Sequence, residues 1–501
     1  MIWPLRRAMQ VAPGRPAVSF EGTELTYAQT WERCRRLAGG LRALGLDRGD
    51  RVAVVAQNSH RYLELYQAVP SAGLVLVPLN HRHADRELRY ALEDSGAKVL
   101  FTAREIAGLP ACVEHVVDAA DGHEDLVAGA EPADFPDDVS EDDLAGLFYT
   151  GGTTGASKGV MLRHRSLVSQ ALHLQAVLPF ASDTCFLVVA PMFHLAGTLA
   201  VLATVWHGGR QIVIRAFDAP ALLDLVEREQ VTVTQVVPSM LAAITDEQLA
   251  RPRDVSSLQL LTFGGAPSAT ETLRRARRAF PDAELATMYG ATETAPLVTT
   301  VRHLDRHLDS PRAGTCGRPL IGVEARIVDP EDRTPLAVGE VGEVAVRGPN
   351  VMLGYWNKPE QTDEVLAGGW YHSGDLGRFD EDGYLYLVDR AKDMIVSGGE
   401  NVYSTEVEDV LYRHEAVLEA AVFGVPDERW GEAVHAVVVP RDEVTEDELI
   451  RHCREEIAGY KVPKRIELRA EPLPKSGAGK VLKRELRAPY WEGRESMVSG
   501  A

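Results

Sequence analysis

Short apolar runs rich in β-branched residues alternate with amphipathic stretches through the first two thirds of this chain. Segments 51–55 and 99–102 are two of the apolar runs, whereas residues 26–44 and 219–229 carry apolar residues at helical spacing. Such alternation is typical of α/β layers built on mostly parallel sheets. The other strands expected in this region are 74–78, 144–148, 186–190, 211–214 and 258–263.

The pattern changes after about residue 312, where short strand-like runs are separated by glycine and proline. This texture predicts a smaller β-rich unit with strands at 323–328, 342–346 and 383–387. A last segment, from about residue 393, has its own helix and strand pattern, and Thr405 with Glu408 fits a capping box at the start of a helix. A chain of 501 residues exceeds what one core usually serves, so we expect two or more domains.

The formal net charge of −20 argues against a nucleic acid or an anionic membrane surface as the main partner. Part of this charge lies in residues 118–143, which contain no lysine or arginine and are interpreted as a solvated connector. The five cysteines are scattered without CxxC spacing, so neither a disulfide framework nor a zinc site is expected, and a reducing cytoplasm fits.

The apolar stretch 186–206 is long enough to imitate a transmembrane helix. Pro191 and His194 interrupt it, and two glycines close it. We interpret it as a buried strand, a turn, and a buried helix from about residue 196, with no integral membrane segment.

A loop rich in glycine and threonine follows the expected strand 144–148. Its sequence is YTGGTTGASKG, from Tyr149 to Gly159. Glycines let backbone N–H groups turn toward an anion, and the hydroxyls and Lys158 add donors and charge, which suits a polyphosphate. Ser157 stands where a Walker A loop needs glycine, so this is a different loop. Alone, it is equally well an ordinary turn.

Three further segments carry polar residues between glycines, and each has an ordinary structural explanation when taken alone. In MYGATET at 288–294, Tyr289 could stack on a purine and Glu293 could bind Mg²⁺. The alternative is an ordinary turn before a helix. WYHSGD at 370–375, with DRAKDMIVSGGEN at 389–401, offers Asp375 for a ribose, or is a hairpin with solvated charges. PKSGAGK at 474–480 ends on Lys480, which by itself is surface charge.

Taken in order, with APMFH at 190–194, GGAP at 264–267 and VRGP at 346–349, these segments resemble the acyl-adenylate-forming superfamily of AMP-binding enzymes. The resemblance spans about residues 25–484, and its motifs are most similar to those of fatty-acyl and aryl-CoA ligases. It implies a large N-terminal domain (1–391) with two α/β subdomains and a small β-barrel. It also implies a small, mobile α+β C-terminal domain (392–501) with its hinge at Lys392.

The resemblance also implies the activity: an ATP- and Mg²⁺-dependent activation of a carboxylic acid to an acyl-adenylate, with pyrophosphate release, followed by transfer to coenzyme A. The implied catalytic residues are Lys480, His194 and Glu293, and Glu293 is also the implied Mg²⁺ ligand. The residues implied to bind ATP or CoA are Thr150, Gly152, Thr153, Thr154, Lys158, Gly265, Ala266, Pro267, Tyr289, Thr292, Asp375, Arg390, Gly399 and Trp430.

This set suits the chemistry, because attack of a carboxylate on the α-phosphorus brings two anions together and needs positioning and charge neutralisation. Other interpretations of two residues stay open: His194 as a satisfied histidine at the mouth of a buried helix, and Trp430 as an ordinary buried aromatic. The chain also departs from the family pattern, with Gly151 in place of serine, Ser157 and Ser404 in place of prolines, and Val462 in place of a basic residue.

The final acceptor and the acid also have alternatives. An amine, a carrier-protein thiol or nitrite could replace CoA as the second nucleophile, and a non-catalytic nucleotide-binding regulator is the alternative from another class. The stretches expected to line the acyl pocket are small and apolar, which favours a medium-to-long fatty acid or a cinnamate- or benzoate-like acid over an amino acid.

Overall fold

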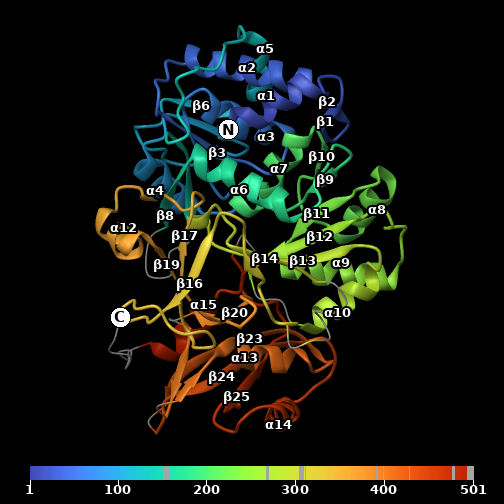
Figure 1. The fold of residues 1–501 in the computed structure, drawn as a ribbon, viewed down its shortest axis with the longest axis vertical. Helices are drawn as coiled ribbons and strands as arrows, with labels where there is room; N and C mark the ends of the chain where they lie inside the picture. The colour runs from blue at the N-terminus through green and yellow to red at the C-terminus, as the bar shows by residue number, and fades with distance from the viewer. Residues whose placement is uncertain are drawn as a thin grey trace.

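Two large sheets dominate the protein in its computed structural model (Figure 1). The structure describes residues 1–150, 157–266, 270–303, 310, 312–390, 393–398, 400–427, 429–476 and 480–492. In the described part of the chain, no helix is both long enough and apolar enough to span a bilayer.

The first sheet has seven strands in the order β18-β8-β7-β4-β3-β5-β6. Strands β7, β4, β3, β5 and β6 are parallel, and β8 and β18 add an antiparallel edge. Their bounds are β3 Arg51–Val55, β4 Val75–Pro78, β5 Val99–Thr102, β6 His115–Asp118, β7 Leu144–Thr150, β8 Lys158–Arg163 and β18 Gly354–Tyr355.

The second sheet has nine strands in the order β15-β14-β13-β12-β11-β9-β10-β1-β2, with a parallel centre from β13 to β1. The bounds are β1 Pro16–Phe20, β2 Thr23–Thr26, β9 Cys185–Val188, β10 Arg210–Val213, β11 Val233–Val236, β12 Leu260–Gly264, β13 Glu284–Tyr289, β14 Thr299–His303 and β15 Arg318–Pro319. The predicted α/β class is confirmed in both sheets.

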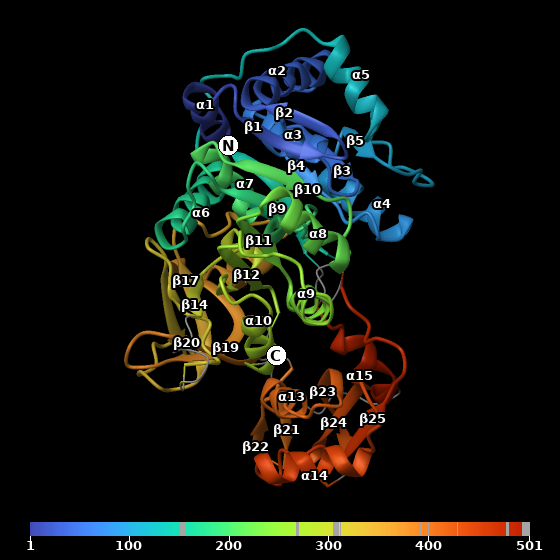
Figure 2. The same ribbon diagram turned by 90° about the vertical axis from the view of Figure 1, so that its right-hand side faces the viewer.

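Helices cover these sheets, and buried residues of several of them join both sheets in one apolar core (Figure 2). The helices are α1 Ile2–Val11, α2 Tyr27–Ala43, α3 His60–Ser71, α4 Asp85–Ser95, α5 Asp121–Gly129, α6 His164–Val177, α7 Leu195–His207, α8 Ala219–Glu229, α9 Pro238–Ala250, α10 Thr270–Ala279 and α12 Pro359–Val365, with the 3₁₀ turns η1 Thr292–Thr294 and η2 Ala367–Gly369. Thr26 caps α2 with a capping box to Gln29, which fixes the helix start where the sequence pattern placed it.

The β-rich unit is a four-stranded antiparallel sheet in the order β16-β17-β19-β20. Its strands are β16 Glu324–Val328, β17 Gly342–Arg347, β19 Tyr371–Phe379 and β20 Leu385–Arg390. The expected closure into a small barrel is not confirmed and stays a prediction.

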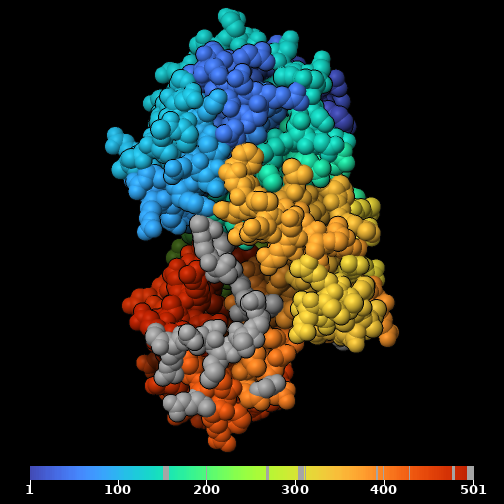
Figure 3. All heavy atoms as spheres, turned by 90° about the vertical axis from the view of Figure 1, so that its left-hand side faces the viewer, coloured from blue at the N-terminus to red at the C-terminus, as the bar shows by residue number. Residues whose placement is uncertain are grey.

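The C-terminal part packs β21–β25 with three helices around a separate apolar core. Figure 3 shows this part in orange and red below the blue and cyan N-terminal elements. The bounds are β21 Ile395–Ser397, β22 Glu400–Val402, α13 Ser404–Tyr412, β23 Val417–Asp427, β24 Gly431–Pro440, α14 Glu446–Glu456, β25 Arg465–Leu468 and α15 Lys483–Trp491.

The capping box expected from Thr405 and Glu408 is wrong. The helix α13 begins one residue earlier, at Ser404, and the Thr405 hydroxyl donates to the backbone carbonyl of Val388. Glu408 accepts from the backbone N–H of Val422 at 2.8 Å. Both side chains therefore tie the helix to other elements instead of to its own first turn.

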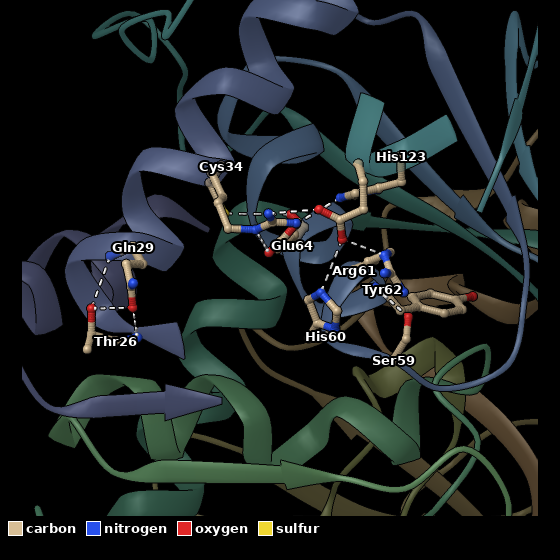
Figure 4. Close-up of polar contacts among 11 residues, drawn as sticks. Thr26, Gln29, Cys34, Ser59, His60, Arg61, Tyr62, Glu64 and His123 are labelled. Carbon is tan, nitrogen blue, oxygen red and sulfur yellow. Dashed lines mark hydrogen bonds and ion pairs between the residues drawn. The ribbon is translucent and has the colours of Figure 1, made fainter. Parts of the chain in front are cut away.

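The acidic stretch 118–143 is more structured than a solvated connector, which corrects that interpretation. It contains α5, whose His123 donates to the buried Glu64 of α3 over 2.8 Å (Figure 4). Arg33 of α2 binds Glu64 at 2.6 Å and Glu124 at 2.9 Å. The basic partners of these acids come from other parts of the chain, so the local sequence alone could not show the pairing.

Candidate active site

Several of the site residues expected from the sequence lie where parallel strands of the nine-stranded sheet end. Segment 189–194 follows β9, residues 265 and 266 follow β12, and segment 290–294 follows β13. Neighbouring registers place these ends side by side, with Gly264 opposite Met288. Ligands of α/β proteins bind at the carboxyl ends of the strands, so this edge is the natural place for a site.

The phosphate-loop candidates sit at the base of a hairpin between β7 and β8, where Thr150 and Lys158 face each other as register partners. The Lys158 ammonium lies 4.7 Å from the centre of the Tyr355 ring. Gly152, Thr153 and Thr154 lie outside the described residues. The antiparallel pairing therefore brings the two ends of the Gly/Thr-rich loop together.

Glu293, the Mg²⁺ candidate, is held by two contacts that originate far along the chain. Its backbone carbonyl accepts from the N–H of Met352 at 2.8 Å, and its Oε1 accepts from the Tyr355 hydroxyl at 2.9 Å. Sequence reasoning missed Tyr355, because its proximity to Glu293 arises only when β18 pairs with β8. Tyr355 therefore contacts the Lys158 ammonium with its ring and the Glu293 carboxylate with its hydroxyl.

The nucleotide-binding candidates Tyr289, Asp375 and Arg390 form one contact network. Tyr289 donates to Asp375 Oδ2 at 2.9 Å, and Arg390 Nε lies 3.2 Å from Asp375 Oδ1. Asp375 and Arg390 are register partners on β19 and β20. A carboxylate fixed from both sides can accept hydrogen bonds from a diol such as a ribose.

A buried tyrosine, Tyr371, lies within electrostatic range of both carboxylates of the site. Burial raises its pKa well above 10, and the nearby charges of Glu293 and Asp375 raise it further. Tyr371 is therefore a neutral hydroxyl near the Mg²⁺ candidate and the ribose candidate. Thr292 lies on η1 beside Glu293.

The adenine candidates Gly265 and Ala266 follow β12, and Gly265 has a φ of +85°. This left-handed conformation favours glycine and turns the chain at the strand end. Pro267 lies outside the described residues, as do Gly399 and the expected hinge residue Lys392.

His194 is the N-cap residue of α7, and its loop is held from another layer of the protein. Asn58 accepts from the Met192 N–H at 2.8 Å and donates to the Ala190 carbonyl at 3.0 Å. One turn into α7, a Cβ on Gly197 would collide with the carbonyl oxygen of Pro191, so the loop packs directly on the helix. This packing fixes the direction in which His194 points.

The imidazole of His194 is neutral at ordinary pH. Its burial lowers its pKa to about 4, and the positive charges of Lys480, His83 and Arg82 contribute to the same effect. Among the described residues, none forms a hydrogen bond with Nε2. The alternative of a satisfied core histidine is therefore disfavoured, because one ring nitrogen remains available to a ligand.

Lys480 comes from the C-terminal part and lies close enough to His194 to act on its pKa. Figure 2 shows the red chain before α15 reaching from the C-terminal part toward the rest of the protein. Lys480 is anchored at the base of a hairpin, where its N–H donates to Ser476 Oγ at 3.2 Å and its carbonyl accepts from the Ser476 N–H at 2.7 Å. This electrostatic effect links two predicted catalytic residues that are 286 positions apart in the sequence.

Trp430 is 39% exposed, so it is not an ordinary buried aromatic. Its carbonyl accepts from the Gly398 N–H at 2.7 Å, and a Cβ on Gly398 would lie 2.7 Å from Trp430 Cε3. Glycine is required at position 398, where φ is +63°, for the indole to pack on the loop. The indole presents an apolar surface beside Gly398, which precedes the ATP- or CoA-binding candidate Gly399 in the sequence.

Comparison with known families identifies the chain. The AMP-binding enzyme family matches residues 5–356, and the AMP-binding enzyme C-terminal domain matches residues 406–480. The chain belongs to the AMP-binding enzyme family. This AMP-binding enzyme is 45% identical over 495 residues to a feruloyl-CoA synthase of Amycolatopsis, covering 97% of this chain and 98% of the relative. It is 36% identical to the fatty acid–acyl-carrier-protein ligase ScoC of Streptomyces coeruleorubidus, covering 96% and 95%.

Solved structures agree with this membership. The ATP-bound MatB from Rhodopseudomonas palustris matches with a TM-score of 0.89 at 33% identity, covering 97% of this chain and 98% of that one. The o-succinylbenzoate CoA synthetase MenE from Bacillus subtilis, in complex with its acyl-adenylate intermediate, matches with a TM-score of 0.86 at 30% identity, covering 97% and 98%. The predicted family, fold class and enzyme class, an AMP-forming acyl-CoA synthetase, are confirmed. The individual site residues and the cytoplasmic location stay predictions.

Proposed function

We propose that this AMP-binding enzyme activates an aryl carboxylic acid of the hydroxycinnamate type with ATP and transfers the acyl group to coenzyme A. The observation that carries the chemistry is that Lys480 of the C-terminal part acts electrostatically on the buried His194, which follows β9 as Glu293 follows β13. This interaction supports a role for Lys480 as the cation beside the expected carboxylate site. The division into domains 1–391 and 392–501, with a mobile second domain, is part of this proposal.

The residues around Glu293 fit a Mg²⁺ ion held together with nucleotide phosphates. Mg²⁺ commonly uses one or two protein carboxylates plus substrate phosphates and water. Glu293 offers one carboxylate, oriented by Tyr355, and Lys158 adds positive charge on the other side of that ring. When bound, the ion would neutralise phosphate charge as pyrophosphate leaves.

The chain's own residues would then perform the positioning. Asp375 would accept the ribose hydroxyls while Arg390 and Tyr289 hold its carboxylate in place. The neutral His194 would lie beside the substrate carboxylate without placing a second full charge there. Lys480 would offset the charge that develops between the attacking carboxylate and the α-phosphate.

The choice of acid rests on the relatives and on the pocket-lining segments. The feruloyl-CoA synthase relative is the more similar of the two curated relatives described above, at 45% against 36% identity. The side chain of Phe193, next to the site candidate His194, is buried against the rings of His81 and His194. Aromatic side chains beside the acid would favour an aryl acid over a flexible alkyl chain because stacked rings gain from specific geometry.

A pyrophosphate-release assay tests this function directly. Purified protein is incubated with ATP, Mg²⁺ and each of a panel of acids: ferulate, 4-coumarate, benzoate, octanoate and palmitate. The proposal expects ferulate or 4-coumarate to give the highest kcat/KM, with CoA required for multiple turnovers. A preference for the fatty acids would overturn the aryl assignment while leaving the ligase activity in place.

A carrier-protein thiol is the second candidate acceptor, because the ScoC relative is a ligase for an acyl-carrier protein. The exposed Trp430 beside Gly398 favours CoA, since an indole can stack on the CoA adenine. Supplying CoA or a phosphopantetheinylated carrier protein to the same assay distinguishes the two acceptors.

A further inference from the structure

A compact polar cluster joins the end of β20 to the C-terminal part, and we call it the hinge clamp. It consists of Asp389, Ser404, Glu408 and Lys483. Lys483 Nζ lies 2.7 Å from Glu408 Oε1 and donates to Ser404 Oγ at 2.6 Å. The Ser404 N–H donates in turn to Asp389 Oδ2 at 2.6 Å.

The hinge clamp is shielded from solvent, so its contacts are stronger than surface pairs of the same kind. The side chains of Lys483 and Glu408 are 17% and 13% exposed, and Ser404 and Asp389 are buried. Glu408 also accepts from the Val422 N–H of β23 at 2.8 Å. Ionic hydrogen bonds in such places fix geometry because each group loses much when its partner moves.

The position of the hinge clamp connects the two halves of the active site. Asp389 precedes Arg390, which contacts the ribose candidate Asp375 at 3.2 Å. Lys483 opens α15 and follows Lys480 by three residues. A short series of contacts therefore runs from the nucleotide-binding strand β20, through Ser404, to the segment that carries the catalytic lysine.

We propose that Lys483 is a positioning residue for Lys480. Through Ser404 and Asp389 it holds the start of α15 in register with β20, so that the Lys480 ammonium reaches the site beside His194. This inference rests on the proposed adenylation role of Lys480. The hydrogen bond and ion pair of Lys483 are to Ser404 and Glu408, outside the nucleotide site, so its loss should change kcat for adenylate formation more than the KM for ATP.

Two half-reactions measured on the same variants test this role. Adenylate formation is followed by carboxylate-dependent exchange of labelled pyrophosphate into ATP, and thioester formation is followed from synthetic acyl-adenylate and CoA. In Lys483→Met, exchange should fall by on the order of 10²-fold, as expected for a displaced catalytic group, while thioester formation stays close to the parent rate. Lys483→Arg should recover most of the exchange activity because it can keep both contacts.

Lys483→Met leaves the Glu408 charge unpaired and could prevent folding, so two further variants are needed. The double variant Lys483→Met/Glu408→Gln removes both charges. Ser404→Ala removes the hydroxyl that accepts from Lys483 and keeps the N–H that donates to Asp389. Both should lower exchange selectively, Ser404→Ala by the smaller factor.

The matched control is Lys461→Met, which removes an ion pair at 2.7 Å to Glu406 on the same helix α13. It should leave both half-reactions unchanged. Equal losses in the two half-reactions for the double variant and Ser404→Ala, or full exchange activity in both, would overturn the inference. A parent protein that exchanges pyrophosphate with none of the acids would instead overturn the proposed function, so the two failures are distinguishable.

Discussion

The Tyr355 hydroxyl donates a 2.9 Å hydrogen bond to Glu293 Oε1, and this contact orients the one carboxylate expected to bind Mg²⁺. The two residues are 62 positions apart and meet because the short strand β18 pairs with β8. Tyr355 is buried, so its hydroxyl has a fixed direction. An outer partner of this kind sets which oxygen of Glu293 faces the ion.

Tyr355→Phe removes that hydrogen bond and little else. Loss of an outer-shell partner typically weakens metal binding by about 10–100-fold, so the Mg²⁺ concentration that half-saturates pyrophosphate exchange should rise by a similar factor. Titrating Mg²⁺ at fixed ATP measures the shift. Tyr386→Phe, which removes a 3.3 Å contact to Asp380 on the neighbouring sheet, is the control and should leave the titration unchanged. Equal curves for Tyr355→Phe and the parent would contradict the assigned role.

Lys480→Ala should abolish most adenylate formation. Removing one preorganised donor to a developing charge costs on the order of 10²–10³-fold in kcat, and the expected loss in pyrophosphate exchange is of that size. Thioester formation from supplied acyl-adenylate should be nearly normal, because the proposed mobile C-terminal domain would withdraw Lys480 from the site for that step. Lys475→Ala is the control, because Lys475 lies in the same loop as Lys480 and forms an ion pair with Glu419 of β23. Parental exchange rates in Lys480→Ala would refute the mechanism.

Asp375→Asn should weaken ATP binding. The substitution removes the charge that pairs with Arg390 at 3.2 Å and accepts from Tyr289 at 2.9 Å. Hydrogen bonds to charged groups contribute about 1.5–3 kcal/mol, so the KM for ATP should rise by roughly tenfold or more while the KM for the acid changes little. Steady-state kinetics in both substrates give the answer, with Asp380→Asn as the surface control. An unchanged KM for ATP would remove Asp375 from the nucleotide site.

Glu64→Gln should destabilise the N-terminal part without altering the active site. Glu64 is buried and binds Arg33 at 2.6 Å and His123 at 2.8 Å (Figure 4). Breaking a buried ion pair by removing one partner costs about 3–5 kcal/mol because the other charge is left uncompensated. Urea denaturation should report this loss in the free energy of unfolding. A loss below 1 kcal/mol would show that the pair is relaxed in solution.

Glu124 should make stability depend on acid pH. Burial alone would raise its pKa, but the hydrogen bonds from Arg33 and Arg61 lower it from 4.5 to about 2. Its stabilising effect is therefore complete above pH 4.5 and is lost progressively as the pH falls from 4.5 through 2. Thermal melts over this range should decline more steeply for the parent than for Glu124→Gln, with Glu141→Gln behaving like the parent. Parallel declines in parent and Glu124→Gln would contradict the shift.

The sequence predicted the bounds of helices and strands better than it predicted which side chains contact one another. Strand 51–55 and helix 219–229 have the predicted bounds, because their apolar periodicity reflects burial that is local to the chain. Motif order was enough to assign the family and to nominate Asp375, Arg390 and Tyr289. It could not reveal that these three bind one another, since strand pairing between distant segments creates that network.

Two errors have a common origin in distant partners. Thr405 and Glu408 have capping-box spacing, yet both side chains bind groups outside their own helix. The acids of segment 118–143 have no basic neighbour in sequence, yet Glu124 binds arginines from α2 and α3. A local sequence pattern predicts that a polar side chain binds a partner nearby in the sequence. In the folded protein these side chains bind groups from distant segments instead.

The close packing of Gly197 on the Pro191 carbonyl limits how this enzyme can acquire new substrates. Any side chain at position 197 would push the loop away from α7 and change the orientation of His194. Substitutions at this position would therefore lower the rate of catalysis before they changed the preference for an acid. Evolution toward a different acid, or an engineering library with that aim, must therefore vary side chains such as Phe193 and leave position 197 untouched.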